Sequence, residues 1–131
     1  MKFDGFSFRG RFNRAKYWRI KIGILLANLG FHIWVAIHHG HSSLHQPPSK
    51  IGDWILIGGV VLVTLVSLWL SIATDVKRFH DRDKSGWWVW IILIPGAGAI
   101  WLLVECGFLP GTTGPNRFGP DPLADKPGRA P

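Results

Sequence analysis

The adjacent pair His80-Asp81 is the residue combination in this chain that most directly suggests catalytic chemistry. Histidine and aspartate together can hold a metal ion for hydrolysis, but such a site needs further histidine or carboxylate ligands within reach. Asp75 and Asp83 lie nearby, whereas the other five histidines all lie between residues 32 and 45. Because this ligand set is too small, we predict that the chain is not an enzyme. The pattern favours a structural role, in which Asp81 and Asp83 pair with arginines.

A second candidate metal site is a group of histidines between two apolar segments. Its members are His38, His39, His41 and His45. Clustered histidines can bind zinc, copper or nickel. However, this loop contains two consecutive prolines, and Asp53 is the only carboxylate close to it. A solvated polar loop is therefore the favoured interpretation, and we expect no cofactor.

Basic and aromatic residues alternate in residues 6–18, immediately before an apolar run. Aromatic rings favour the membrane interface, and Lys and Arg residues there each contribute about 1 kcal/mol of attraction to an anionic surface. An interfacial anchor that also fixes the orientation of the chain is the favoured interpretation. The sharper alternative is a defined site for a lipid headgroup or another anionic ligand. Its candidate residues are Arg9, Arg11, Arg14, Tyr17 and Trp18.

Three apolar segments must position these polar groups. They cover about residues 18–37, 54–73 and 87–108, and each reaches the ~20 apolar residues that a membrane-spanning helix needs. Seven of the eight Trp residues lie toward the ends of these segments, as expected for amphipathic rings at a membrane interface. The sequence therefore predicts an all-α membrane protein with three transmembrane helices. We expect a single domain over residues 1–123 and a disordered tail over residues 124–131.

The distribution of basic residues predicts how the chain is oriented. Eleven of the fifteen Lys and Arg residues lie in residues 1–21 and 74–86, whereas residues 38–53 contain only Lys50. Cytoplasmic loops carry such an excess, so we expect the N-terminus and residues 74–86 in the cytoplasm and residues 38–53 outside. The net charge of +7 does not indicate a nucleic-acid partner, because the basic residues abut apolar runs instead of covering a soluble surface.

The third apolar segment is interrupted near its middle by Pro95-Gly96-Ala97-Gly98. Proline removes a backbone hydrogen bond and clashes with the preceding turn, but membrane helices tolerate it. We therefore favour a kinked but continuous third helix, which places the C-terminal tail outside. The alternative is a shallow re-entrant hairpin, shielded by protein, which returns the tail to the cytoplasm.

A cytoplasmic tail would bring distant polar residues to one membrane face. The arginines of residues 6–18 could then meet polar groups from residues 78–85 and from the tail. The candidate members of this cytoplasmic polar cluster are Arg78, His80, Asp81, Ser85, Asn116, Arg117 and Asp121. We also expect Ser85 to start the third helix, since serine is a favourable N-cap residue.

Three motifs in this order resemble those of a known bacterial family. They cover residues 6–18, 78–88 and 111–122, around the apolar segments. Together they resemble the family catalogued as domain of unknown function 805. Lys77 departs from the pattern, because an arginine is expected before Arg78. The resemblance implies a multi-pass protein of the bacterial inner membrane whose activity is unknown, and it supplies no catalytic residues.

The functional class that the sequence favours is a non-enzymatic membrane protein. It would act through interaction with itself, with a membrane partner protein or with anionic lipid. The alternative is a small transporter or channel subunit that works as an oligomer, because three spans are too few to enclose a pathway alone. Asn28 is the one strongly polar side chain deep in a predicted span. We expect it to face another helix, either of this chain or of a second copy.

Overall fold

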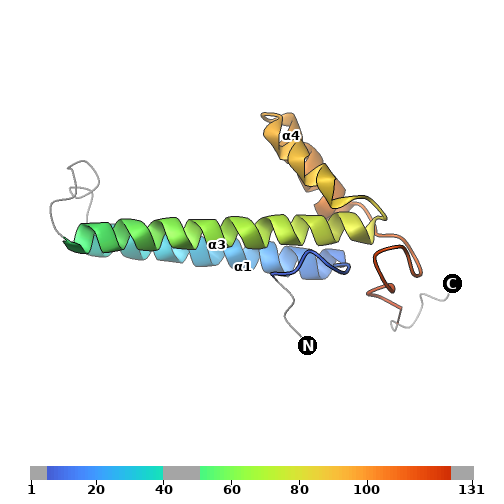
Figure 1. Cartoon of the computed structure of the whole chain (residues 1–131), viewed down its shortest axis with the longest axis horizontal. Helices are drawn as coiled ribbons and strands as arrows, with labels where there is room; N and C mark the ends of the chain where they lie inside the picture. Colours follow the sequence, from blue (N-terminus) through green and yellow to red (C-terminus); the bar gives the residue numbers. More distant parts are fainter. Residues whose placement is uncertain (1–5, 40–50, 125–131) are drawn as a thin grey trace.

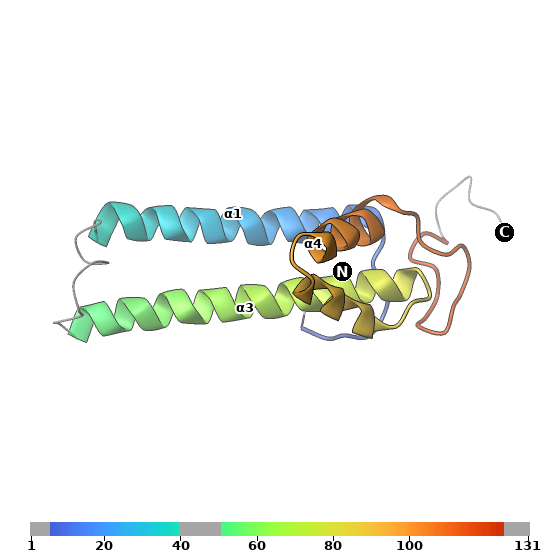
Figure 2. The ribbon, with the colours of Figure 1, turned by 90° about the horizontal axis from the view of Figure 1, so that it is seen from above.

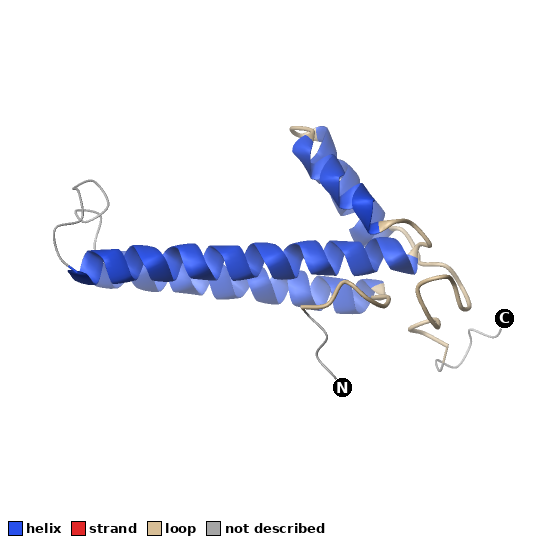
Figure 3. Cartoon of the chain, in the orientation of Figure 1, coloured by secondary structure: helices blue, strands red, loops and turns tan. Residues whose placement is uncertain are grey.

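The computed structural model describes residues 6–39 and 51–124, and all regular elements within them are helical (Figure 3). They are the α-helices α1 (Arg14–His39), α3 (Ile51–Asp81) and α4 (Ala97–Leu102), the 3-10 helix η1 (Gly86–Leu93) and the π-helix η2 (Leu103–Phe108). The predicted all-α class is confirmed for this part of the chain.

Two long apolar helices, α1 and α3, lie side by side and dominate the molecule (Figures 1 and 2). They contain 26 and 31 residues, and both are long and apolar enough to cross a membrane. At about 1.5 Å per residue each exceeds the ~30 Å hydrocarbon core of a bilayer. Large apolar side chains such as Leu25 and Leu65 are more than half exposed on their surfaces. In water such surfaces would be unfavourable, whereas in lipid they are not.

One polar contact joins the middles of the two long helices. The side-chain amide of Asn28 donates to the Ser67 hydroxyl at 2.7 Å and to the backbone carbonyl of Ile24 at 2.8 Å. The expectation that Asn28 faces another helix is therefore confirmed, and that helix belongs to the same chain. This pairing satisfies polar groups that would be costly to leave unpaired among apolar side chains.

The third apolar segment breaks where the sequence predicted, but it does not continue as a kinked helix. Elements η1 and α4 contact one another, and the chain reverses between them (Figure 2). Pro95 and Gly96 make the reversal, with Gly96 at a positive φ of 72° that glycine adopts readily. At about 2.0 Å per residue, the eight residues of η1 are too short to cross a bilayer. The predicted three transmembrane helices are therefore not confirmed.

The buried core lies where the hairpin 86–108 meets the first turns of α1 and the last turns of α3. The side chains that form it are Tyr17, Val76, Phe79, Val89, Leu102 and Cys106. In Figure 1 the hairpin rises from this end of the helix pair, and the opposite end extends away from it. The last two turns of α3, residues 74–81, are almost entirely buried. Among residues 6–39 and 51–124, the tight packing is therefore concentrated at one end of the helix pair.

We predict that Gly98→Ala destabilises the hairpin. A Cβ atom at this position would lie 1.9 Å from the backbone carbonyl oxygen of Ile91, so the two hairpin segments would have to separate. Overpacking of this kind costs about 1–3 kcal/mol, which thermal unfolding in detergent would report as a lower midpoint. Gly59→Ala in α3 is the matched control, because nothing lies within 4 Å of a Cβ atom there. Equal midpoints for the two variants would contradict the hairpin contact.

Candidate functional site

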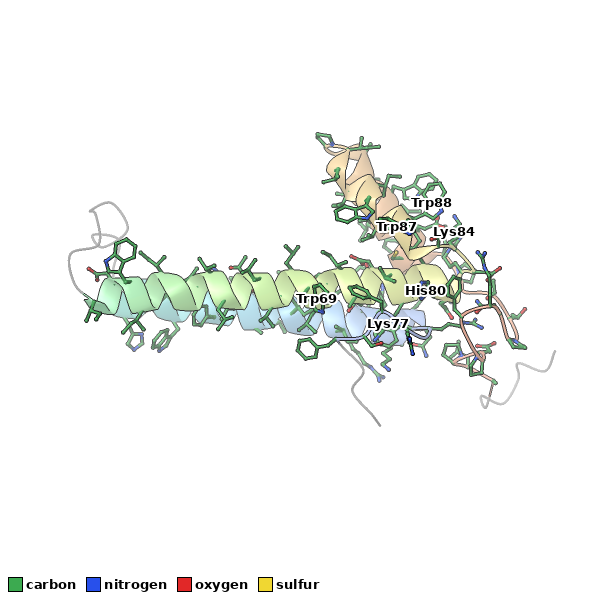
Figure 4. All side chains as sticks on the ribbon, in the orientation of Figure 1. Trp69, Lys77, His80, Lys84, Trp87 and Trp88 are labelled. Atoms are coloured by element: carbon green, nitrogen blue, oxygen red, sulfur yellow. The ribbon has the colours of Figure 1, made fainter. Side chains whose placement is uncertain are left out.

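Polar segments that are far apart in the sequence meet at the packed end of the molecule. Residues 6–13 cross one face of the helix pair, and the C-terminal residues 109–124 fold around the end of α3 (Figure 1). Both contact the last turns of α3, where Figure 4 shows His80, with Lys84 in the loop that follows. Five residues from residues 6–13, the C-terminal end of α3 and residues 109–124 are connected by hydrogen bonds. We call them the polar cluster: Arg11, Arg78, Asp81, Thr112 and Asn116.

Asp81 lies at the centre of the polar cluster. Its Oδ1 atom accepts from Arg11 Nε at 3.1 Å, and its Oδ2 atom accepts from Arg78 Nη1. The side chains of Arg11 and Arg78 are 2% and 0% exposed, and that of Asp81 is 5% exposed. Burial raises the pKa of the Asp81 carboxyl, while both guanidinium groups act in the opposite direction. The packing requires glycine at position 111, where a Cβ atom would lie 2.0 Å from Asp81 Oδ2.

Arg11 binds the C-terminal segment to the N-terminal arm. Its Nη2 atom donates to the carbonyl oxygen of Thr112 at 2.7 Å, and its Nη1 atom donates to that of Gly114 at 2.8 Å. A third carbonyl, that of Gly119, lies 3.2 Å from Nη1. The planar guanidinium group can serve several acceptors at once, which the single ammonium of lysine cannot reproduce.

Arg78 plays the same part on the other side of Asp81. Its Nε atom donates to the carbonyl oxygen of Cys106 at 2.7 Å, and its Nη2 atom donates to that of Leu109. These bonds attach the end of η2 to α3. The preceding residue, Lys77, is fully buried, with its Nζ atom 4.5 Å from the centre of the Phe12 ring. A cation–π contact therefore occupies the position at which the family pattern led us to expect arginine.

His80 and Asn116 connect the remaining part of the C-terminal segment to α3. Asn116 Nδ2 donates to the His80 carbonyl oxygen at 2.9 Å and to the Thr112 hydroxyl at 3.0 Å. The imidazole ring of His80 stacks on the ring of Phe118, with centres 3.9 Å apart. Burial lowers the pKa of His80, so its neutral form is favoured in the folded protein.

The other predicted members of the cluster lie around its edge. Arg117 pairs with Asp83 at 3.0 Å, and both side chains are largely exposed. The carboxylate of Asp121 accepts from the backbone N–H of Gly114 at 3.1 Å. The Ser85 hydroxyl accepts from the Trp87 backbone N–H at 3.4 Å, so Ser85 caps η1 as predicted. The structure thus brings all seven predicted residues to one end of the molecule, where Arg117 bonds to Asp83 and Asp121 bonds to Gly114.

The five residues considered as an anion site divide into two groups. Arg11 and Tyr17 are buried, and Trp18 donates its indole N–H to the Gly107 carbonyl oxygen at 3.1 Å. These three are therefore part of the internal packing. Arg9 and Arg14 are exposed, although Arg14 also donates to the Phe108 carbonyl oxygen at 3.1 Å.

A buried ion pair between α1 and α3 was missed by the sequence analysis. Lys21 Nζ donates to Asp75 Oδ2 at 2.9 Å, and Asp75 is 6% exposed. The second carboxylate oxygen of Asp75 is buried without a hydrogen-bond partner among the described residues. The sequence did contain a signal for this pair. Lys21 lies just after the start of the first apolar segment, and Asp75 lies just after the end of the second. Two neighbouring antiparallel helices place such positions side by side.

No metal site is formed by the residues that the structure describes, among which no three His, Cys, Asp or Glu residues are grouped to hold an ion. His38 lies at the far end of α1, where its Nδ1 atom is 2.9 Å from the Trp34 carbonyl oxygen. His41 and His45, and the side chain of His39, lie outside the described residues. The suggestion of a histidine metal site in this loop therefore stays a hypothesis.

These features define an all-helical protein with two long apolar helices, a hairpin and a buried polar cluster at one end. Residues 5–120 match the model of a protein family of unknown function, DUF805, and the chain belongs to this family. The resemblance seen in the three motifs is thereby confirmed.

Relatives from Escherichia coli K12 support the family assignment. Inner membrane protein YhaH is 34% identical over 123 residues, which cover 88% of this chain and 87% of the relative. Uncharacterized protein YiiR is 31% identical over 140 residues, which cover 88% of this chain and 86% of the relative. Inner membrane protein YhaI is 38% identical over 74 residues, which cover 51% of this chain and 61% of the relative. No solved structure matches this chain.

We predict that Asp81→Asn lowers the free energy of unfolding by about 3–5 kcal/mol, because it leaves two buried guanidinium groups without a counter-charge. The change keeps the size of the side chain, so packing is preserved. Asp83→Asn is the matched control, since its partner Arg117 is 64% exposed and a surface ion pair contributes about 1 kcal/mol or less. Denaturant titration in detergent measures both. Similar losses for the two variants would show that the polar cluster does not stabilise the fold.

Proposed function

We propose that α1 and α3 span the bacterial inner membrane and that the hairpin 86–108 enters it from the cytoplasmic side without crossing. Three observations support this arrangement: the length of the two long helices, their exposed apolar side chains, and the reversal of the chain at Pro95. A hairpin at membrane depth must satisfy its backbone internally, and the helical segments η1, α4 and η2 provide this. The basic residues of the described segments lie at the packed end, which the positive-inside rule assigns to the cytoplasm.

This arrangement predicts that both chain ends are cytoplasmic. Reporters fused before Met1 and after Pro131, each active on one side of the membrane only, should give the same cytoplasmic signal. A reporter inserted within residues 40–50 should give the opposite signal and serves as the control. A C-terminal reporter active only outside would mean that the hairpin opens and crosses the membrane, and it would contradict the topology.

We further propose that the protein acts without catalysis, by holding anionic phospholipid at the cytoplasmic membrane surface. The observation that supports this is an imbalance of charge at the packed end. Four acidic side chains at this end form ion pairs with basic residues of the same chain: Asp75, Asp81, Asp83 and Glu105. Arg9, Arg14 and Arg19, which we call the basic rim, are exposed. Basic residues beside a membrane each contribute about 1 kcal/mol of attraction to anionic lipid.

Several polar side chains are hydrogen-bonded to one another or to the backbone, which also favours a binding role over catalysis or transport. Asp81 accepts from two arginines, and Ser85 caps η1, so neither is left as a base or nucleophile. Asn28 and Ser67, the strongly polar pair between the long helices, bond to one another instead of lining a path. A small transporter would need polar groups facing an aqueous route through the membrane. We therefore place transport second.

We predict that the reconstituted protein prefers phosphatidylglycerol to phosphatidylcholine and that the double variant Arg9→Gln and Arg14→Gln loses much of this preference. Spin-labelled lipids measure it as the fraction of each lipid immobilised by the protein. The preference should also weaken between low and high salt, because exposed charges are screened. The control is the variant Arg9→Lys and Arg14→Lys, which keeps both charges. Equal immobilisation of the two lipids by the unmodified protein would reject the proposed function.

A further inference from the structure

A groove of about 640 Å³ runs between α1 and α3. The α1 wall includes Gly23 and Ala27, and the α3 wall includes Val63 and Leu70. The groove is hollow because Gly23 has no side chain, and nothing lies within 4 Å of the position that a Cβ atom would take. Arg19 lines the end of the groove nearest the packed end of the molecule.

The groove lies on the face of the helix pair away from the hairpin. Trp18 contacts the hairpin through its bond to the Gly107 carbonyl oxygen. Successive residues of an α-helix are rotated by about 100°, so Gly23 and Ala27 lie about 140° and 180° around α1 from Trp18 and point away from the side that it occupies. Arg19, about 100° from Trp18, lies at the edge of this face. The hairpin therefore does not fill the groove, and its occupant must come from outside the described residues.

The walls of the groove favour an apolar occupant. Apart from Arg19, its one polar lining side chain is Ser67, whose hydroxyl already accepts from Asn28 at 2.7 Å. A polar ligand would lose its hydration there without finding hydrogen-bond partners in return. A hydrocarbon chain has no hydration to lose on entering, and it makes close contacts with the groove walls.

The length of the groove matches one leaflet of a bilayer. From Arg19 to Ala27 the α1 wall rises about 12 Å, compared with about 15 Å for half of a ~30 Å hydrocarbon core. A neighbouring helix would need a complementary face along the whole span, whereas an acyl chain needs only this half. No acidic side chain in residues 6–39 and 51–124 forms an ion pair with Arg19. Its guanidinium group is therefore available to an anion at the membrane surface.

We propose that this groove binds one anionic phospholipid of the cytoplasmic leaflet, with its phosphate on Arg19 and one acyl chain along Gly23 and Ala27. This inference rests on the proposed function and adds a defined site to the general attraction of the basic rim. A guanidinium group can donate two parallel hydrogen bonds to a phosphate, which fixes the headgroup as well as attracting it. The groove then fixes the chain below it.

Native mass spectrometry of the full chain, purified in detergent and incubated with phosphatidylglycerol, tests the site. The unmodified protein should retain one lipid per chain. The variant Gly23→Leu and Ala27→Leu fills the groove with all charges intact, and Arg19→Gln removes the phosphate contact with both walls intact. Each should weaken lipid retention about tenfold, since loss of a charge-assisted bond or of a buried chain segment is worth that much in affinity. Ala36→Leu, at an exposed position on the side of α1 that Trp18 occupies, is the matched control.

The possible outcomes separate this inference from the proposed function. Retention by the filled-groove variant equal to that of the unmodified protein overturns the groove site, while the proposed function is judged by the Arg9 and Arg14 variants. Retention of phosphatidylcholine equal to that of phosphatidylglycerol overturns the anionic selectivity. Displacement of the lipid by glycerol phosphate alone would overturn the role of the acyl chain. A second protein copy in place of lipid would assign the groove to self-association and overturn the proposal.

Discussion

The carboxylate of Asp81, shared between Arg11 and Arg78, is the interaction on which the rest of this structure depends. All three side chains are almost completely buried, and a buried charge is tolerated only with a counter-charge and further hydrogen bonds. Both arginines meet this requirement by donating to backbone carbonyls, Arg11 to that of Thr112 and Arg78 to those of Cys106 and Leu109. Residues 6–13, the end of α3 and the C-terminal segment therefore depend on one another. None of these segments can separate from the others without leaving a buried charge unpaired.

The hairpin is the second constraint, because it decides which carbonyls Arg78 can reach. The chain reverses at Pro95 and Gly96, and Gly98 lets the two hairpin segments approach at the backbone. Only this reversal brings the end of η2 back to α3, where the carbonyls of Cys106 and Leu109 accept from Arg78. A continuous helix would carry both carbonyls away. The hairpin and the polar cluster are therefore one cooperative unit.

Ion pairing within the chain also decides which charges remain on the outer surface of the molecule. The chain carries a net charge of +7, and four acidic side chains at the packed end are held in ion pairs with part of its basic residues: Asp75, Asp81, Asp83 and Glu105. The residues of the basic rim, Arg9, Arg14 and Arg19, lie on the exposed surface. Exposed basic residues beside a membrane would attract anionic lipid, which is the role that we propose. The same imbalance is the basis of both the orientation and the binding role that we propose.

The sequence by itself determined the long apolar helices, the position of the break and the polar motifs that meet, because length, hydropathy and proline act locally. It also predicted that Asn28 would face a helix. The direction of the chain after Pro95 was decided only by tertiary contact, since Gly98 fits against Ile91. The sequence also could not predict that Arg11 is buried while Arg9 is exposed. Residues 6–13 form no regular secondary structure, so no helical or strand periodicity assigns their side chains to one face. Which charges lie inside depends on the carbonyls that the folded chain brings to them.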